Sequence, residues 1–337
     1  MQMGTFASEI ASEFLQQHAE PGEPEIQEGT FASQARIFLQ SLSARRSPAK
    51  PATIATWRSL IDTHILPQIG RESLASFDNG AMKCFVDFLC SDGELSPRHV
   101  RDVVLVTKLI LKSAIDEQGN YLYPRVWNNA FLDLPRVKPS NGRAATQEII
   151  EDAIKILPPK YAMLVALGAA TGLRIGELLA IRIGEDGENT CWVEKDAAIH
   201  VRRSIWHGQV QEPKTASAHR TVDLCAEINS AVANFASNRQ SYLFASRTES
   251  PLSATTVYKH ALSKTQIPGA HALRRFRVSH LRKHFNVVPE DLLRYWIGHA
   301  NKTITDDYSR LAQDVPLRKR IVEQVRLGFS LPLGDVS

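Results

Sequence analysis

Residues 171–177 have the sequence TGLRIGE, which places Arg174 directly after a glycine turn and inside the most apolar long window of the chain, residues 161–181. Arg174 and Glu177 stand three positions apart, so a helix that begins here brings both side chains onto one face. The pair has two interpretations. It is a structural ion pair that holds two helices together, or Glu177 holds Arg174 rigid so that its guanidinium grips a phosphate or another oxyanion with two hydrogen bonds.

The same window argues against a membrane protein, because a membrane-spanning helix would not tolerate Thr171, Arg174 and Glu177 cheaply. With 43% hydrophobic and 23% charged residues over 337 positions, the chain can bury real cores and is neither disordered nor collagen-like. The N-terminus lacks a cationic segment followed by an apolar run, so no secretory signal is expected. Four cysteines without C-x-x-C or zinc-finger spacing indicate reduced thiols. We therefore expect a cytoplasmic protein with no membrane contact.

The net charge of +4 hides a strong asymmetry between the two parts of the chain. Residues 1–28 contain six Glu and no Lys, Arg or Asp, so this extension carries −6. All 40 Lys and Arg lie in the remaining 309 residues against 30 acidic residues, which gives +10. This basic body, residues 29–337, points to a polyanionic partner. We expect the acidic extension to regulate access to that partner or to contact another protein.

Upstream of residues 171–177, apolar residues at helical spacing predict four short helices, over residues 34–42, 51–65, 82–89 and 96–111. The second of these is expected to stop at Pro67. Residues 134–145, LPRVKPSNGRAA, combine two prolines, one glycine and three basic residues, as an interdomain linker does. The predicted organisation is an acidic extension (1–28), a helical domain (29–133), the linker (134–145) and a second domain (146–337).

Downstream, between Cys191 and Leu224, the pattern changes to alternation and predicts a small antiparallel sheet with a turn at His207-Gly208. Lys214 lies in the loop between two of these strands. A lysine at a hairpin tip is usually a solvated charge. In a basic site its pKa can instead be lowered, so that it acts as a proton donor.

Residues 271–274, HALR, place His271 and Arg274 one helical turn apart. From His271 to Pro289 there are five Lys and Arg and no acidic residue, whereas a solvated face normally mixes charge signs. This run favours contact with a nucleic acid. His280 and His284 have the spacing of metal ligands, but no third ligand is evident and we expect no metal.

Gly298-His299 ends a predicted helix, and Tyr308 follows His299 by nine residues. On one uninterrupted helix this spacing would put the two side chains on opposite faces. The glycine and the polar residues after it favour a turn, which allows His299 and Tyr308 to converge. Tyr308 stands between Asp307 and Ser309, and these polar neighbours argue against a role in apolar packing alone.

Taken together, these segments resemble the tyrosine recombinase (phage integrase) family. TGLRIGE, PKT before a short strand, HALRR, IGH and a tyrosine nine residues after that histidine occur in the family's order. Each of these motifs is weak alone, but five in order are specific. The similarity extends from about residue 30 to residue 327, and implies a helical core-binding domain followed by a catalytic domain, in a C-shaped clamp on DNA. The fold class is thus mainly α with a small antiparallel β-sheet.

The resemblance also implies a role for each candidate residue. The two arginines would bind the scissile phosphate, Glu177 would orient the first of them, and Tyr308 would be the nucleophile that forms a 3′-phosphotyrosyl intermediate. Lys214 would protonate the leaving 5′-oxygen, while the two histidines would assist proton transfer and bind the phosphate. The candidate catalytic residues are Arg174, Lys214, His271, Arg274, His299 and Tyr308. Fixed arginines neutralise phosphate charge without a metal, and the tyrosyl ester conserves the bond energy, so no cofactor is expected.

The implied partner is double-stranded DNA carrying specific recombination sites, bound by a homotetramer and associated with the nucleoid. The apolar spacing of Leu317, Ile321, Val325 and Phe329 predicts a C-terminal helix, which packs either onto a neighbouring protomer, as we expect, or back onto its own domain. Two other functions stay open. One is a monomeric enzyme that nicks and reseals DNA like type IB topoisomerases, and the other is a catalytically silent DNA-binding relative.

Overall fold

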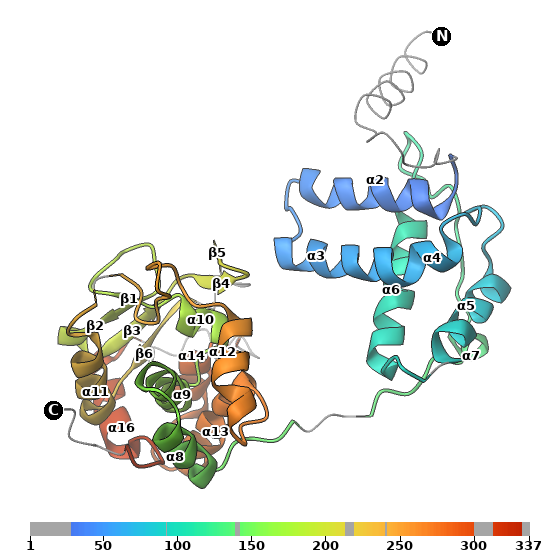
Figure 1. Cartoon of the computed structure of the whole chain (residues 1–337). Helices are drawn as coiled ribbons and strands as arrows, with labels where there is room; N and C mark the ends of the chain where they lie inside the picture. Colours follow the sequence, from blue (N-terminus) through green and yellow to red (C-terminus); the bar gives the residue numbers. More distant parts are fainter. Residues whose placement is uncertain are drawn as a thin grey trace. The chain divides into compact units, whose positions relative to one another are not determined.

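The computed structural model describes residues 28–91, 93–138, 142–212, 219–239, 241–299 and 313–331. The chain forms two compact units, Met1–Pro139 and Ser140–Ser337 (Figure 1). Each unit has a hydrophobic core of its own. The division between them falls within residues 134–145, the segment predicted as a linker. The acidic extension, apart from Glu28, lies outside the described residues.

The first unit is built from helices around one apolar core. They are α2 (Phe31–Ala44), α3 (Pro51–Leu60), α4 (Leu66–Ile69), α5 (Asn79–Ser91), α6 (Pro97–Ser113) and α7 (Asn129–Leu132). Ser96 caps α6, since its hydroxyl accepts the amide N–H of His99 at 3.2 Å, and Pro97 fills the first helical position. Phe38 of α2 stacks on Trp57 of α3, so the predicted apolar faces of these two helices meet.

The second predicted helix does not stop at Pro67. The chain passes from α3 through a π-helical turn, Ile61–Ile65, into α4, and the helical path ends at Gly70. A proline inside a helix lacks an amide donor, and its ring crowds the carbonyl four residues earlier. A wider π turn directly before the proline relieves that conflict without ending the helix.

The second unit surrounds a four-stranded sheet with helices. They are α8 (Gln147–Ile156), α9 (Pro159–Thr171), α10 (Ile175–Leu179), α11 (Ala226–Ala236), α12 (Ala254–His260), α13 (Ala270–Lys283), α14 (Glu290–Ile297) and α16 (Val315–Val325). Thr146 caps α8, since its hydroxyl accepts the amide N–H of Ile149 at 3.3 Å. Helix α9 is buried nearly all round, which explains the apolar window at its residues.

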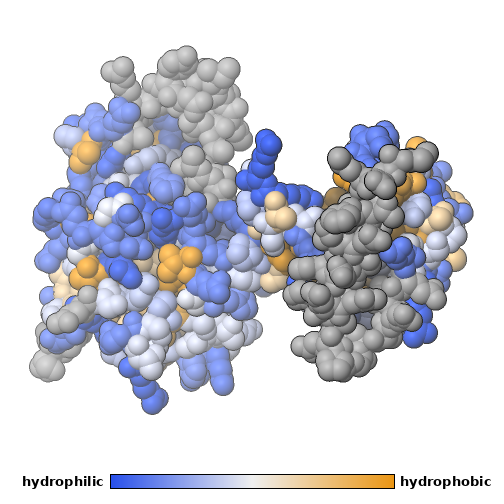
Figure 2. Space-filling view, turned by 90° about the horizontal axis from the view of Figure 1, so that it is seen from above, coloured by the Kyte–Doolittle hydropathy of each residue, from blue (hydrophilic) through white to orange (hydrophobic). Residues whose placement is uncertain are grey.

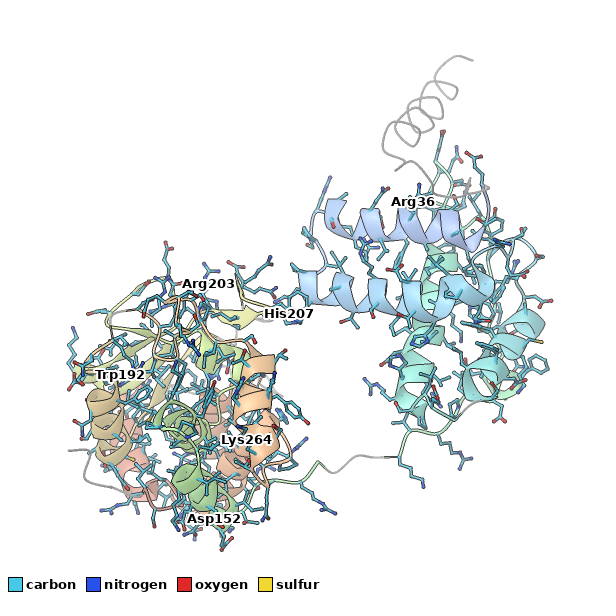
Figure 3. The ribbon with its side chains drawn as sticks, viewed as in Figure 1. Arg36, Asp152, Trp192, Arg203, His207 and Lys264 are labelled. Atoms are coloured by element: carbon cyan, nitrogen blue, oxygen red, sulfur yellow. The ribbon has the colours of Figure 1, made fainter. Side chains whose placement is uncertain are left out.

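The sheet has the strand order β1 (Arg182–Ile183), β2 (Cys191–Val193), β3 (Ala198–Val201) and β6 (Arg220–Asp223). Strands β2, β3 and β6 are antiparallel, while β1 pairs with β2 in parallel, so the sheet is mixed at one edge. Strands β4 (Ser204–Trp206) and β5 (Gln209–Gln211) form a separate hairpin. His207 and Gly208 both have positive φ at its turn, where the sequence predicts one (Figure 3). The predicted fold class, mainly α with a small sheet, is confirmed.

Helix α16 packs on its own unit rather than presenting its apolar face to another protomer. Ile321, Val322 and Val325 are buried in a second apolar cluster together with residues of α13 and α14. Beyond the helix, Phe329 reaches the main core of the same unit. In this structure of a single chain, the helix takes the second of the two alternatives and folds back on its own domain.

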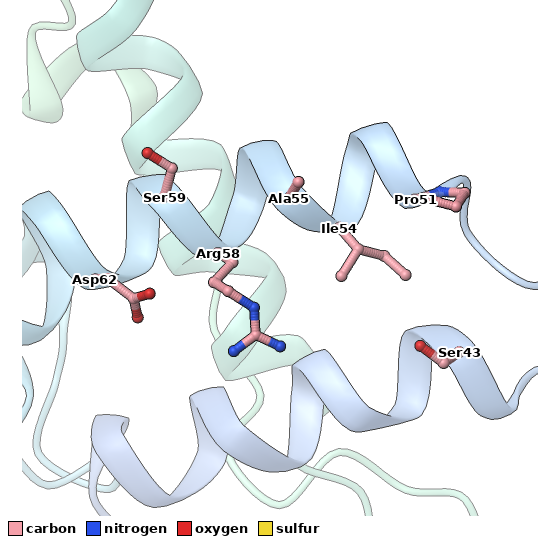
Figure 4. Close-up of a pocket in the computed structure, with 7 residues that line it drawn as sticks. All are labelled: Ser43, Pro51, Ile54, Ala55, Arg58, Ser59 and Asp62. Atoms are coloured by element: carbon pink, nitrogen blue, oxygen red, sulfur yellow. The ribbon is translucent and has the colours of Figure 1, made fainter. Parts of the chain in front are cut away.

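The described part of the face seen in Figure 2 is mostly hydrophilic, with separate small apolar areas. No helix in the described ranges is both long and apolar enough to span a bilayer. A groove follows α2 and α3 and is lined by Ile54, Arg58 and Asp62 among others (Figure 4). None of the candidate catalytic residues that the structure describes lines this groove.

Candidate active site

The glycine turn after α9 places Arg174 at the start of α10. Gly172 has φ +68°, the left-handed conformation that favours glycine. A Cβ at this position would lie 2.9 Å from the side chain of Ile297 on α14, so the turn needs glycine for space as well. Arg174 is the N-cap residue of α10, with extended backbone. The turn thereby brings Arg174 next to the end of α14.

Glu177 holds Arg174 from the first turn of α10. Its Oε2 accepts the backbone N–H of Arg174 at 2.8 Å, and its Oε1 accepts Nη1–H of the Arg174 guanidinium at 3.0 Å. The predicted i, i+3 pair is confirmed. The Glu177 side chain is 5% exposed and that of Arg174 45% exposed. A buried anion therefore fixes a guanidinium that remains open to solvent, a geometry that suits oxyanion binding better than the joining of two helices.

Arg274 lies on α13, buried, with two hydrogen bonds to backbone carbonyls. Its Nη1–H donates to the oxygen of Gly172 at 3.0 Å, and its Nη2–H donates to that of Ile297 at 2.6 Å. Burial, followed by the positive charge of Arg174, lowers the pKa of Arg274 to about 10. Arg274 is therefore still a cation at neutral pH, and a bound anion would relieve the repulsion between the two arginines.

The C-terminal end of α14 joins the parts of the site. The three consecutive carbonyls of Trp296, Ile297 and Gly298 accept N–H groups from three different arginines. The donors are Arg220 at 2.8 Å, Arg274 at 2.6 Å and Arg174 at 3.4 Å, in that order. The last carbonyls of a helix have no partner inside the helix and carry partial negative charge, so cations are stabilised there. The end of α14 thus gathers guanidinium groups directly before His299.

His271 and His299 belong to the same positively charged surroundings. Burial lowers the pKa of His271, and the charges of Arg275, Arg274 and Arg174 lower it further. Burial also lowers the pKa of His299, with Arg274 and Arg174 adding to the effect. Both imidazoles are therefore neutral at neutral pH, and each can accept a proton at one nitrogen and donate one at the other.

Five of the seven residues predicted for the site therefore come together from α10, α13 and the end of α14. They are Arg174, Glu177, His271, Arg274 and His299. The other two, Lys214 and Tyr308, lie outside the described residues, and their place in the site stays a prediction. Among the described residues, no three His, Cys, Asp or Glu side chains gather as metal ligands would.

One buried residue of this arrangement is missing from the sequence-based prediction. Arg220 begins β6, and its side chain is 0% exposed. It donates to both oxygens of Glu177, at 3.1 and 2.8 Å. The signal for it was available, because alternation along β6 puts Arg220 on the same inward face as Val222. An arginine at an inward position of a strand requires a buried partner.

The second unit is also where sequence comparison finds a match. The phage integrase family matches residues 144–314, just over half of the chain. No curated protein matches the sequence.

Solved structures match nearly the whole length of the chain. The Tn1549 transposon integrase in complex with transposon right end DNA has a TM-score of 0.62 at 17% identity, over 88% of this chain and 99% of that one. A lambda integrase tetramer bound to a Holliday junction has a TM-score of 0.61 at 14% identity, over 88% of each chain. At these identities the similarity shows a shared fold. The family match covers more than half of the chain, and this chain therefore belongs to the phage integrase family and is a tyrosine recombinase.

Proposed function

We propose that this enzyme cleaves and rejoins double-stranded DNA at a specific site through a covalent 3′-phosphotyrosyl intermediate formed by Tyr308. The observation that carries the proposal is the paired guanidinium groups of Arg174 and Arg274 at the end of α14. A phosphodiester gains negative charge on its non-bridging oxygens as it is attacked. Two fixed cations stabilise that charge without a reorganisation at the moment of reaction.

In the proposed cleavage step the phenolic oxygen of Tyr308 forms a bond to the scissile phosphorus, and the bond from phosphorus to the 5′-oxygen breaks. Lys214 gives its proton to that leaving oxygen, which becomes a free 5′-hydroxyl. His271 assists removal of the proton from Tyr308, and His299 donates a hydrogen bond to the phosphate. The reverse step, with a 5′-hydroxyl as attacking group, rejoins the strand, so no nucleotide cofactor is consumed.

We further propose that the acting form is a homotetramer on two DNA sites, as the lambda integrase tetramer on a Holliday junction suggests. The protein would then be associated with the nucleoid when it is bound to DNA. Helix α16 does not supply the contact between protomers in this proposal, since its apolar face is covered within its own unit. That packing favours a second candidate, a monomeric enzyme that nicks and reseals DNA. The mass of the complex on DNA distinguishes the two.

Covalent capture tests the proposed function and finds the DNA site in one experiment. The protein is incubated with sheared genomic DNA of its source organism, denatured in detergent, and the covalently attached DNA is sequenced. A nicked duplex with the recovered site then traps the intermediate, because the short strand after the cleavage point diffuses away. We expect an adduct from the wild type and none from Tyr308→Phe. An adduct of equal yield from Tyr308→Phe would overturn the assignment of the nucleophile.

A further inference from the structure

Arg220 and Glu177 form a fully buried ion pair at the centre of the site. The side chain of Arg220 is 0% exposed and that of Glu177 is 5% exposed. Both carboxylate oxygens accept from Arg220, and both also accept from Arg174, one from the guanidinium and one from the backbone amide. Rotation of the Glu177 carboxylate would therefore break contacts with both arginines at once.

Arg220 also keeps Glu177 ionised in an apolar place. Burial alone would raise the pKa of Glu177, but the hydrogen bonds and the charge of Arg220, followed by those of Arg174, hold it below its ordinary value. A protonated Glu177 would lose one of its acceptor positions and its attraction for Arg174. The orientation of the exposed guanidinium of Arg174 thus depends on a second arginine whose side chain is fully buried.

The turn that carries His299 rests on the same guanidinium group. Nε–H of Arg220 donates to the oxygen of Trp296 at 2.8 Å. A Cβ added to Gly298 would lie 2.7 Å from Nη1 and 2.9 Å from Cζ of Arg220. Gly298 therefore packs its α-carbon against the guanidinium, and the backbone directly before His299 is in contact with Arg220.

Arg220 also joins β6 to two helices of the site. It is the first residue of β6, and it is anchored on α10 through Glu177 and on α14 through Trp296. Lys214 stands six positions earlier in the sequence and lies outside the described residues.

From these contacts we infer that Arg220 is a positioning residue for strand cleavage. It orients the Arg174 guanidinium through Glu177, and it fixes the position of the backbone before His299 through Trp296 and Gly298. The inference rests on the proposed function. This role differs from a purely structural one. Loss of a residue that only stabilises the fold would not change how much faster or slower the enzyme cleaves a charged scissile phosphate than an uncharged one.

The chain offers a matched control for burial and charge. Arg318 of α16 is another buried arginine, with its side chain 6% exposed, and it pairs with the buried carboxylate of Asp223 at 2.9 Å. Asp223 ends the same strand that Arg220 begins, and neither Asp223 nor Arg318 is bonded to Glu177 or Arg174 in the described contacts. Arg318→Met thus removes a comparable buried ion pair that includes neither Glu177 nor an arginine of the site.

The experiment measures single-turnover cleavage by the full chain at saturating DNA, on the nicked duplex found by covalent capture. Two versions of the duplex are compared, one with a normal scissile phosphate and one with a methylphosphonate, which carries no negative charge. The variants are Arg220→Met, Arg220→Lys and Arg318→Met. DNA affinity and thermal unfolding are recorded for each, and Arg220→Lys carries the comparison if Arg220→Met does not fold.

We expect the substitution at Arg220 to slow cleavage of the phosphate duplex about 100-fold, the cost of a small misplacement of a catalytic group, at nearly unchanged DNA affinity. The loss on the methylphosphonate duplex should be about tenfold smaller, because a neutral centre needs less help from Arg174. Arg318→Met should lower the unfolding temperature without changing the ratio of the two rates.

Equal losses on both duplexes, or an Arg220 variant that behaves like Arg318→Met, would overturn the positioning role and leave the proposed function intact. Absence of any adduct from the wild type would overturn the proposed function itself, and the inference with it.

Discussion

Glu177 is the residue on which the geometry of the arginines depends. It is almost completely buried, yet it balances the charges of Arg174 and Arg220 and accepts a backbone amide in addition. A carboxylate in such a place is stable only while its cations remain, and the buried cation is stable only while the carboxylate remains. The two buried charges are therefore interdependent.

Glu177→Gln should consequently lower both stability and activity. Removing one partner of a buried ion pair leaves the other charge uncompensated, which costs about 3–5 kcal/mol of unfolding free energy. Urea denaturation measures this loss. As a control, Glu185→Gln removes an exposed pair with Lys195 and should leave the unfolding free energy nearly unchanged. A Glu177→Gln protein as stable as the wild type would contradict the structure at this position.

His280 makes the stability of the second unit depend on pH. Burial lowers its pKa to about 4, and Nε2–H of the neutral ring donates to the oxygen of Val325 at 3.0 Å. Its pKa in the unfolded chain is about 6.5. Between these values the unfolded chain binds a proton that the folded chain does not, so acid favours unfolding.

We therefore expect the unfolding free energy to fall as the pH is lowered from about 6.5 to about 4, in a series of denaturation curves. His280→Gln keeps a donor for Val325 but cannot titrate in this range, so it should make the pH dependence shallower. If the variant and the wild type lost stability in parallel over this window, His280 would not be the responsible group.

The sequence predicts which site residues pair where those residues lie in one short motif. Arg174 and Glu177 share one helical turn, as do His271 and Arg274, so local spacing was enough to pair them. Arg220 differs because its partner lies 43 positions away and its role follows from tertiary contacts alone. The contribution of Trp296, Ile297 and Gly298 is made by backbone carbonyls, which no side-chain pattern records.

At the scale of elements, α16 is attached to its unit by charge as well as by apolar packing. Asp223, at the end of β6, accepts the indole N–H of Trp296 at 2.8 Å and Nε–H of Arg318 at 2.9 Å. At the other end of the helix, Arg277 of α13 donates to the oxygen of Arg326 at 2.7 Å. The sequence showed the apolar face of this helix but could not say which surface covers it, because both alternatives bury the same residues.

A double-mutant cycle tests the ion pair between Asp223 of β6 and Arg318 of α16. Asp223→Asn keeps an acceptor for Trp296 but leaves Arg318 buried without its counter-charge, which should cost about 3–5 kcal/mol. Adding Arg318→Met removes the stranded charge, so the double variant should be more stable than Asp223→Asn alone. Strictly additive losses in urea denaturation would show that the two residues do not act as a pair.

The π turn at Ile61–Ile65 is the other element that sequence patterns missed. Proline is read as a helix stop because it removes a hydrogen bond and crowds the previous turn. The apolar core around Ile61, Ile65 and Ile69 stabilises continuation of the helix instead. Tertiary packing outweighs the local preference here.

At the scale of the whole molecule, the distribution of charge bears on DNA binding. The body carries +10 and residues 1–28 carry −6. A basic surface binds DNA by releasing counterions from phosphates, so affinity falls steeply with salt, roughly a thousand-fold between about 50 and 200 mM for six or more phosphate contacts. An acidic segment on the same chain opposes that attraction most at low salt.

We therefore expect that deletion of residues 1–28 tightens DNA binding at low salt and that the difference from the full chain shrinks as salt rises. Fluorescence anisotropy with the captured duplex measures both affinities across a salt series. A flat salt response of the full chain would contradict binding through the basic body. An unchanged affinity after deletion at every salt concentration would contradict a role of the extension in access to DNA.

Peptide mass spectrometry of the trapped adduct shows whether Tyr308 is the residue that carries the DNA. The adduct formed on the nicked duplex is digested with nuclease and protease, and the peptide that retains a nucleotide is sequenced. We expect one modified peptide, with the 3′-phosphate ester on Tyr308 and a free 5′-hydroxyl on the released strand. A nucleotide on any other residue, or a 5′-phosphate ester, would contradict it.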